Sequence, residues 1–257
     1  MSLTVVVVHP DLLGTYGDGG NGVVLAQRAR WRGIAAELVE ATSDLALPEG
    51  DVYCLGGGED AAQTASAERL RAEGTLEQAV AHGAAVLAVC AGYQIVGRSF
   101  AGADGRLLQG VGLLDVATVK GAGRRAVGEL LATPLDGRLP VLTGFENHGG
   151  VTARGHGVAP LARVAAGVGN GDGTEGAVSG KVVGTYLHGP ALARNPALAD
   201  LLLSWVTGQQ LEPLADAEES ALRAERIAAV RARRAGRAGR LARYALGAPS
   251  HGPHGSS

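Results

Sequence analysis

Cysteine, aromatic residues and long apolar runs are all scarce in this sequence. Its 257 residues include two cysteines, one methionine and two phenylalanines, and aromatic residues make up 4%. Neither Cys54 nor Cys90 belongs to a CxxC pair or a Cys/His cluster with metal-ligand spacing, so we expect no bound metal. The apolar run in MSLTVVVVHP is too short for a membrane span or a signal peptide, and no basic residue precedes it. These absences favour a reducing, cytoplasmic location.

A nucleotide-binding motif and a basic body are missing as well. No GxxxxGK[ST] sequence is present, so we expect no ATP site in this chain. The formal net charge is −2, and residues 217–257 hold eight Arg and three Glu, which leaves the first 216 residues acidic overall. An acidic body argues against a nucleic-acid-binding protein.

The chain is rich in glycine and small apolar residues, and its sequence pattern is typical of an α/β fold. It contains 41 glycines and 46% hydrophobic residues. The first elements we expect are strands at 3–9, 35–40, 51–55 and 85–89, with helices at 21–32 and about 61–82. Strands and helices that alternate over short connections predict a mostly parallel central sheet flanked by helices.

The second half of the chain predicts an antiparallel strand extension and a C-terminal helix. Its expected elements are strands at 111–119, 125–132, 140–145, 161–166 and 175–187, followed by helices at 195–206 and 216–244. We therefore divide the chain into a main domain over 1–210, a helical extension over 211–246 and a disordered tail over 247–257.

The stretch AVLAVCAGYQ, residues 85–94, predicts a reactive cysteine. Residues 85–89 suit a buried strand, and the helical pattern begins directly after Cys90. A sharp turn from strand to helix holds a nucleophile clear of the sheet edge. The free N–H groups at the start of the helix favour a thiolate over a thiol. A buried cysteine that serves only as a small apolar residue is the alternative, and we expect that role for Cys54.

Two further loops are expected at the same edge of the sheet. GGGED at 56–60 follows one predicted strand, and YLHGP, which contains His188, follows another. A thiol nucleophile needs an imidazole to take its proton, so His188 is the natural partner of Cys90. Attack on a carboxamide also needs donors for the oxyanion. The backbone N–H of Ala91 and one from the glycine loop are the candidates.

Together these motifs resemble class I glutamine amidotransferases, in the branch related to cobyric acid synthase. The resemblance rests on the glycine loop, on CAGYQ at 90–94 and on GTYLHGP at 184–190. YGDGGN at 16–21 and FENHGG at 145–150 narrow it to the glutaminase subunits of lipid II isoglutaminyl synthases. The resemblance implies a flavodoxin-like α/β fold and hydrolysis of L-glutamine to glutamate and ammonia through a Cys thioester.

The resemblance also implies roles for individual residues. Cys90 would be the nucleophile and His188 its general base and acid. The N–H of Ala91, with that of Gly57 or Gly58, would form the oxyanion hole. Arg125, or its neighbour Arg124, would bind the substrate α-carboxylate, and Gln94 would belong to the substrate site.

One position departs from the family pattern. Class I enzymes usually carry Glu two residues after the histidine, whereas this chain has Pro190. A backbone carbonyl, Asp18, Glu146 or a carboxylate from a partner subunit remain as candidates to orient His188. We expect the partner to supply it, because a triad completed only on assembly would not waste glutamine. Asp18 by itself is typical of a turn.

The implied partner is a Mur-ligase-like synthetase subunit that forms a heterodimer with this chain. The partner would hold ATP and Mg²⁺ and would amidate the D-glutamate of lipid II, a membrane-bound substrate that this chain would meet only indirectly. The complex would then lie at the inner face of the membrane. The Arg-rich C-terminal helix could touch anionic headgroups, pack on the partner or simply be solvated.

Three alternatives remain. The chain could supply ammonia to another synthetase, such as one for corrinoid amidation. It could be a non-catalytic scaffold that keeps the fold. It could also be a stress protein with an elbow cysteine on the same fold.

Overall fold

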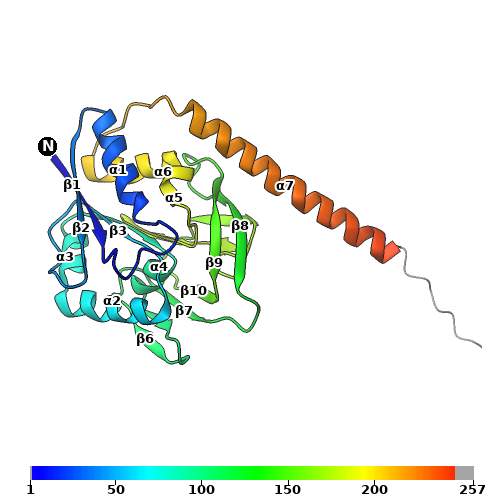
Figure 1. The fold of residues 1–257 in the computed structure, drawn as a ribbon, viewed down its shortest axis with the longest axis horizontal. Coiled ribbons are helices and arrows are strands. Elements are labelled where there is room, and N and C mark those ends of the chain that lie inside the picture. The colour runs from blue at the N-terminus through cyan, green and yellow to red at the C-terminus, as the bar shows by residue number, and fades with distance from the viewer. Residues whose placement is uncertain (1, 247–257) are drawn as a thin grey trace, which may run out of the picture.

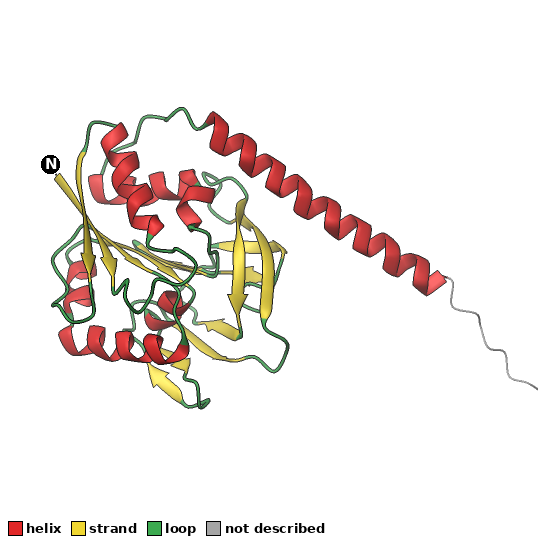
Figure 2. Ribbon diagram, viewed as in Figure 1, coloured by secondary structure: helices red, strands yellow, loops and turns green. Residues whose placement is uncertain are grey.

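A six-stranded sheet forms the centre of the molecule, and helices cover both of its faces (Figure 1, Figure 2). The computed structural model describes residues 2–246, with side chains through residue 236. In spatial order the strands are β13 (Ala177–Ser179), β14 (Val182–Thr185), β4 (Ala85–Val89), β3 (Val52–Leu55), β1 (Ser2–Val8) and β2 (Ala35–Ala41). Only the β13–β14 pair is antiparallel. The mostly parallel central sheet that we predicted is confirmed.

The helices follow the predicted positions with two differences. They are α1 (Gly20–Trp31), α2 (Asp60–Glu73), α3 (Thr75–Ala81), α4 (Ala91–Ile95), α5 (Ala191–Arg194), α6 (Pro196–Thr207) and α7 (Ala217–Leu246). We did not predict α5, and our prediction of a single helix over 61–82 is wrong. Gly74, at φ 68°, adopts the left-handed conformation that ends α2 and starts α3.

Two four-stranded sheets form the extension. The first has the order β10 (Gly150–Arg154), β7 (Val116–Lys120), β5 (Ser99–Ala101), β6 (Leu107–Gln109). The second has the order β12 (Thr174–Glu175), β11 (Ala162–Ala166), β8 (Ala126–Pro134), β9 (Leu142–His148). The pairs are antiparallel except β5–β7, which is parallel. We did not predict β5, β6 and β10.

Close packing beneath helix α4 fixes the position of the residue that precedes it. A Cβ atom at Gly92 would lie 2.7 Å from Cβ of Leu55, and one at Gly184 would lie 1.9 Å from Cδ2 of Tyr93. Only glycine allows α4 to approach β3 and β14 this closely. The short helix is therefore held against the strand ends, with Cys90 at its start.

Helix α7 contacts the body of the protein along its first part and then extends beyond it (Figure 1). Its inner side packs through Val230 against Leu131 and Ala166. None of the helices within residues 2–246 is both long and apolar enough to cross a membrane. Residues 247–257, which we predicted to be a disordered tail, lie outside the described residues.

Candidate active site

The site residues lie in loops that follow four neighbouring parallel strands, at one edge of the sheet. Strands β14, β4, β3 and β1 lie side by side, and each is followed by a loop at its carboxyl end. Cys90 follows β4 and His188 follows β14, and the Cys90 N–H donates to the Thr185 carbonyl at 2.9 Å. Open α/β sheets bind ligands at this edge. The structure thus places Cys90 and His188 on the same side, as their proposed pairing requires.

Cys90 has the strained backbone of a nucleophile elbow. Its φ is 53° and its ψ −103°, a backbone conformation that residues other than glycine rarely adopt. Such strain costs on the order of 1–3 kcal/mol and accumulates at functional sites. The Gly92 N–H donates to the Gly56 carbonyl at 3.0 Å, which ties the elbow to the glycine loop. The side chain is 9% exposed and faces a cavity.

An acid of the chain itself orients His188. Nδ1 of the imidazole lies 2.8 Å from Oδ2 of Asp18, and both side chains are buried. Our expectation that a partner supplies this carboxylate is wrong for this reason. Glu146 does not take the role either, because its carboxylate accepts the N–H groups of Val168 and Gly169.

The surroundings of His188 favour the protonated ring. Burial lowers the pKa of His188, but the hydrogen bond to Asp18 and the proximity of Cys90 outweigh it and raise the pKa to about 10. Within the described residues, Nε2 of His188 makes no hydrogen bond. The Cys90 thiol points instead at the Asn147 carbonyl, 3.9 Å away. Catalytic hydrogen bonds often tighten only when substrate binds.

Gly57 and Gly58 of the glycine loop have different surroundings. The Gly57 N–H donates to Oδ2 of Asp18 at 2.9 Å, so it is not free to bind an oxyanion. A Cβ atom at this position would lie 2.7 Å from Cε1 of His188. Of the two glycines that we named for the oxyanion, Gly57 is therefore already engaged, which leaves Gly58 as the candidate, and Gly57 instead makes room for the histidine. Gly58 and Ala91 both line the cavity, and Ala91 is the first residue of α4.

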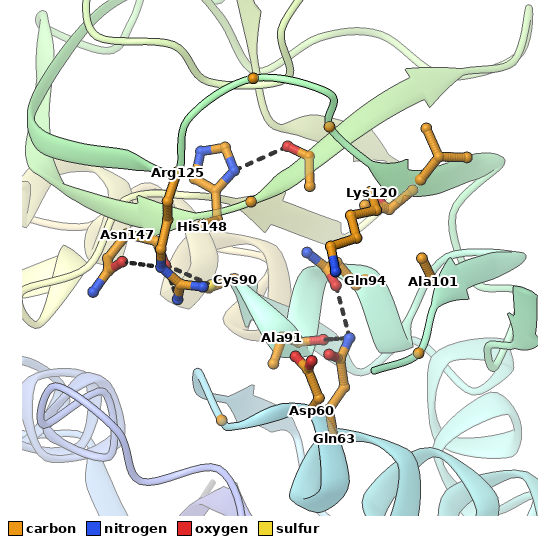
Figure 3. Close-up of a pocket in the computed structure, with 18 residues that line it drawn as sticks. Asp60, Gln63, Cys90, Ala91, Gln94, Ala101, Lys120, Arg125, Asn147 and His148 are labelled. Carbon is orange, nitrogen blue, oxygen red and sulfur yellow. Dashed lines mark hydrogen bonds between the residues drawn. The ribbon is translucent and has the colours of Figure 1, made fainter. Parts of the chain in front are cut away.

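A cavity of about 260 Å³ opens over Cys90. Arg125, Asn147 and Lys120 line it together with Ala91 and Gln94 of α4 (Figure 3). Arg125 lines this cavity and Arg124 does not, which selects Arg125 as the candidate for a substrate carboxylate. Its Nη2 donates to the Asn147 carbonyl at 3.0 Å, and its Nε donates to Oδ1 of the same residue.

Two glutamine side chains, those of Gln63 and Gln94, also line the cavity (Figure 3). Gln63 donates from Nε2 to Oε1 of Gln94 at 2.8 Å, and Gln94 donates to the Tyr186 hydroxyl at 3.3 Å. Gln94 was predicted at the substrate site, and it lines the cavity. We did not predict Gln63, because nothing in the α2 sequence separates it from an ordinary helical glutamine.

Two further residues, His148 and Cys54, have structural roles. His148 lines the cavity, but its ring stacks on Tyr186 with centroids 3.7 Å apart, and Nδ1 contacts the Gly150 carbonyl oxygen at 3.0 Å. Cys54 lies in the core, and burial raises its pKa to about 12. Among residues whose placement is described, no three His, Cys, Asp or Glu side chains gather as a metal site.

Comparison with known proteins identifies relatives over most of the chain. Residues 4–196 match the CobB/CobQ-like glutamine amidotransferase domain. The subunit GatD of lipid II isoglutaminyl synthase (glutamine-hydrolyzing) from Staphylococcus aureus is 34% identical over 88% of this chain and 94% of its own length. The Streptococcus pneumoniae subunit of the same name is 31% identical over 79% of each chain. Cobyric acid synthase from Methylorubrum populi is 41% identical over 47% of this chain and 25% of its own length.

Solved structures support the fold. A crystal structure of a glutamine amidotransferase aligns with a TM-score of 0.55 at 23% identity, over 79% of this chain and 98% of that chain. The structure of PurLQS from Thermotoga maritima aligns with a TM-score of 0.50 at 17% identity, over 80% and 96%. The α/β architecture expected from the motifs is thus confirmed.

Proposed function

This chain belongs to the CobB/CobQ-like glutamine amidotransferase family, and from that premise we propose that it is the glutaminase subunit of a lipid II isoglutaminyl synthase. It hydrolyses L-glutamine at Cys90 and passes ammonia to a Mur-ligase-like partner, which amidates the D-glutamate of lipid II. The observation that carries the chemistry is the buried Asp18–His188 pair beside a strained cysteine that faces a cavity.

In the first half-reaction Cys90 attacks the side-chain amide of glutamine. The protonated ring of His188 already holds the proton of the Cys90 thiol, so the sulfur attacks as a thiolate, a C–S bond forms at the amide carbon, and the carbonyl electrons move to oxygen. The N–H groups of Gly58 and Ala91, which border the cavity, bind this oxyanion. When the intermediate collapses, the C–N bond breaks and His188 returns its proton to the leaving nitrogen, which departs as ammonia.

In the second half-reaction water hydrolyses the γ-glutamyl thioester. His188 takes a proton from the water as its oxygen attacks the thioester carbon, and the C–S bond then breaks. Glutamate leaves, the proton of its new γ-carboxyl group passes to solvent, and the proton taken from water stays on His188 beside the Cys90 thiolate. Throughout, Asp18 keeps the imidazole oriented through Nδ1.

Arg125 binds the α-carboxylate of the substrate. A guanidinium matches a carboxylate with two parallel hydrogen bonds. In the free protein the Arg125 guanidinium donates to Asn147, so the substrate carboxylate would replace Asn147 as the acceptor of these hydrogen bonds.

The choice of partner rests on the extent of similarity. The isoglutaminyl synthase subunits match most of this chain, whereas the cobyric acid synthase relative matches less than half of it. We propose that ATP and Mg²⁺ bind to the partner subunit, because the acceptor carboxylate must be activated there. A glutaminase that serves corrinoid amidation is the second candidate.

The decisive experiment is a glutaminase assay with and without a co-expressed Mur-ligase-like protein. Wild type should release glutamate, the partner should stimulate it, and Cys90→Ala should be inactive in both settings. Cys54→Ala is the matched control and should keep its activity, because Cys54 lies in the core and does not line the cavity. An inactive wild type with the partner present would favour the scaffold alternative, and activity in Cys90→Ala would exclude the proposed nucleophile.

A further inference from the structure

Tyr16 combines backbone strain with an exposed ring. It lies in the loop between β1 and α1, with φ at 63°, and its side chain is 47% exposed. A positive φ costs conformational free energy in a bulky residue, and a half-exposed ring buries too little apolar surface to offset that cost. Its contacts at the site are what compensate the cost.

The first contact is with the catalytic histidine. The Tyr16 and His188 rings lie edge to face, with centroids 4.9 Å apart and an interplanar angle of 65°. Aromatic pairs favour this geometry, and the face of an aromatic ring stabilises an imidazolium that points its edge at it. The ring of Tyr16 thus restricts how His188 can tilt about its bond to Asp18.

The second contact leads to the cavity. The Tyr16 hydroxyl accepts a hydrogen bond from Nδ2 of Asn147. The same Asn147 accepts both hydrogen bonds from Arg125, and its carbonyl faces the Cys90 thiol. One chain of contacts therefore runs from His188 through Tyr16 and Asn147 to the guanidinium at the substrate cavity.

We propose that Tyr16 is a positioning residue that couples the catalytic histidine to the glutamine-binding side of the cavity. Its ring sets the orientation of His188, and its hydroxyl, through Asn147, sets the place of Arg125. The proposal rests on the proposed function and deepens it. Asp18 stands in the same YGDGGN motif, so one loop provides both supports of the histidine.

The two contacts predict different defects in two variants. Tyr16→Phe keeps the ring and loses the hydroxyl, so KM for glutamine should rise by about 2- to 10-fold, the effect of one neutral hydrogen bond, while kcat stays unchanged. Tyr16→Leu loses both contacts, so kcat should fall as well, by roughly 10-fold, the value of one aromatic pair.

The pH profile of kcat/KM separates positioning from a merely structural role. Asp18 and Cys90 both act on the charge of His188, and both remain in these variants. Loss of the aromatic ring should destabilise the imidazolium and move the alkaline limb to lower pH in Tyr16→Leu. The limb should not move in Tyr16→Phe.

Trp31→Leu is the matched control, because Trp31 is an exposed aromatic residue at the end of α1, 58% exposed and without a role in the site. If Tyr16→Leu has the kcat, KM and pH profile of this control, the proposal is wrong. It is also wrong if Tyr16→Phe loses kcat as severely as Tyr16→Leu. Should Tyr16→Leu fail to fold, KM of Tyr16→Phe decides, and an unchanged value overturns the proposal. A wild type without glutaminase activity would instead refute the proposed function.

Discussion

Oδ2 of Asp18 lies 2.8 Å from Nδ1 of His188, although 170 residues separate the two in the chain. The same oxygen accepts the Gly57 N–H, so one buried carboxylate holds both the histidine and the glycine loop. This bond takes the place of the one that the usual glutamate would make at Pro190. The free chain thus carries its own Cys–His–Asp arrangement.

Replacement of Asp18 by Asn should therefore disable hydrolysis without unfolding the protein. The amide can donate to Nδ1 and would stabilise the wrong tautomer, so kcat should fall by roughly 10²- to 10⁴-fold. Asp11→Asn is the control, because Asp11 lies in the same loop but binds Ser43. Steady-state glutaminase kinetics measure the effect, and an Asp18→Asn enzyme as active as Asp11→Asn would remove Asp18 from the mechanism.

Gly57→Ala should be nearly inactive for a steric reason. The added Cβ would lie 2.7 Å from Cε1 of His188 and 3.3 Å from Oδ2 of Asp18, so the imidazole would have to move. A misplaced catalytic group costs about 10²-fold in rate. Gly137→Ala, where the new Cβ meets nothing within 4 Å, should keep wild-type kinetics. Equal activities of the two variants would contradict the described position of the histidine.

Arg28 should be a major contributor to stability because it joins α1, α6 and the start of α7. Its side chain is 3% exposed and donates to both carboxylate oxygens of Asp200 and of Asp216 at 2.7–2.8 Å. Arg28→Met would leave two half-buried carboxylates short of a partner. The free energy of unfolding should fall by about 2–4 kcal/mol in urea titrations.

An exposed ion pair provides the comparison for Arg28. Arg98 binds Asp115 at 2.8 Å, but its side chain is 61% exposed. Arg98→Met should cost less than about 1 kcal/mol, because solvent screens such pairs. Equal losses in the two variants would mean that burial does not set the value of the Arg28 cluster.

Glu175 should make stability depend on pH. Burial raises its pKa from 4.5 to about 7, although the Thr185 hydroxyl and the Tyr186 N–H favour the charged form. The folded state thus holds a proton that the unfolded state releases, so this contribution is complete below pH 4.5 and is lost as pH rises to about 7. Glu175→Gln removes the titration.

Thermal unfolding of wild type and Glu175→Gln over pH 4–8 tests this linkage. The melting temperature of the variant should rise relative to wild type across that interval, because only wild type loses stability as its carboxyl ionises. Parallel curves would show that the Glu175 carboxyl has the same pKa in the folded and unfolded states.

Much of the fold was readable from local patterns. Continuous runs such as residues 3–9 and 85–89 predict buried parallel strands, and both are strands of the central sheet. The short strands β5 and β6 hold three residues each, too few for a periodic signal. Gly74 lies inside an otherwise helical pattern, and the pattern alone does not reveal its left-handed φ.

The site was predictable in its parts but not in its connections. The elbow sequence identifies Cys90, and the strand end identifies His188. The contact between Asp18 and His188 depends on the order of the strands. Asp18 follows β1 and His188 follows β14, and these two strands lie in one sheet only because β3 and β4 pair between them. For the same reason, the use of the Gly57 N–H by Asp18 had no local signal.

The most direct test of Cys90 as the nucleophile is to trap the covalent enzyme. A glutamine-analogue electrophile, followed by peptide mass spectrometry with the partner present, should label Cys90 alone, and free glutamine should protect it. Cys54 should stay unlabelled, since burial raises its pKa to about 12. His188→Ala should slow the labelling strongly. Labelling at another residue, or none on Cys90 in an active preparation, would contradict the claim that this sulfur performs the reaction.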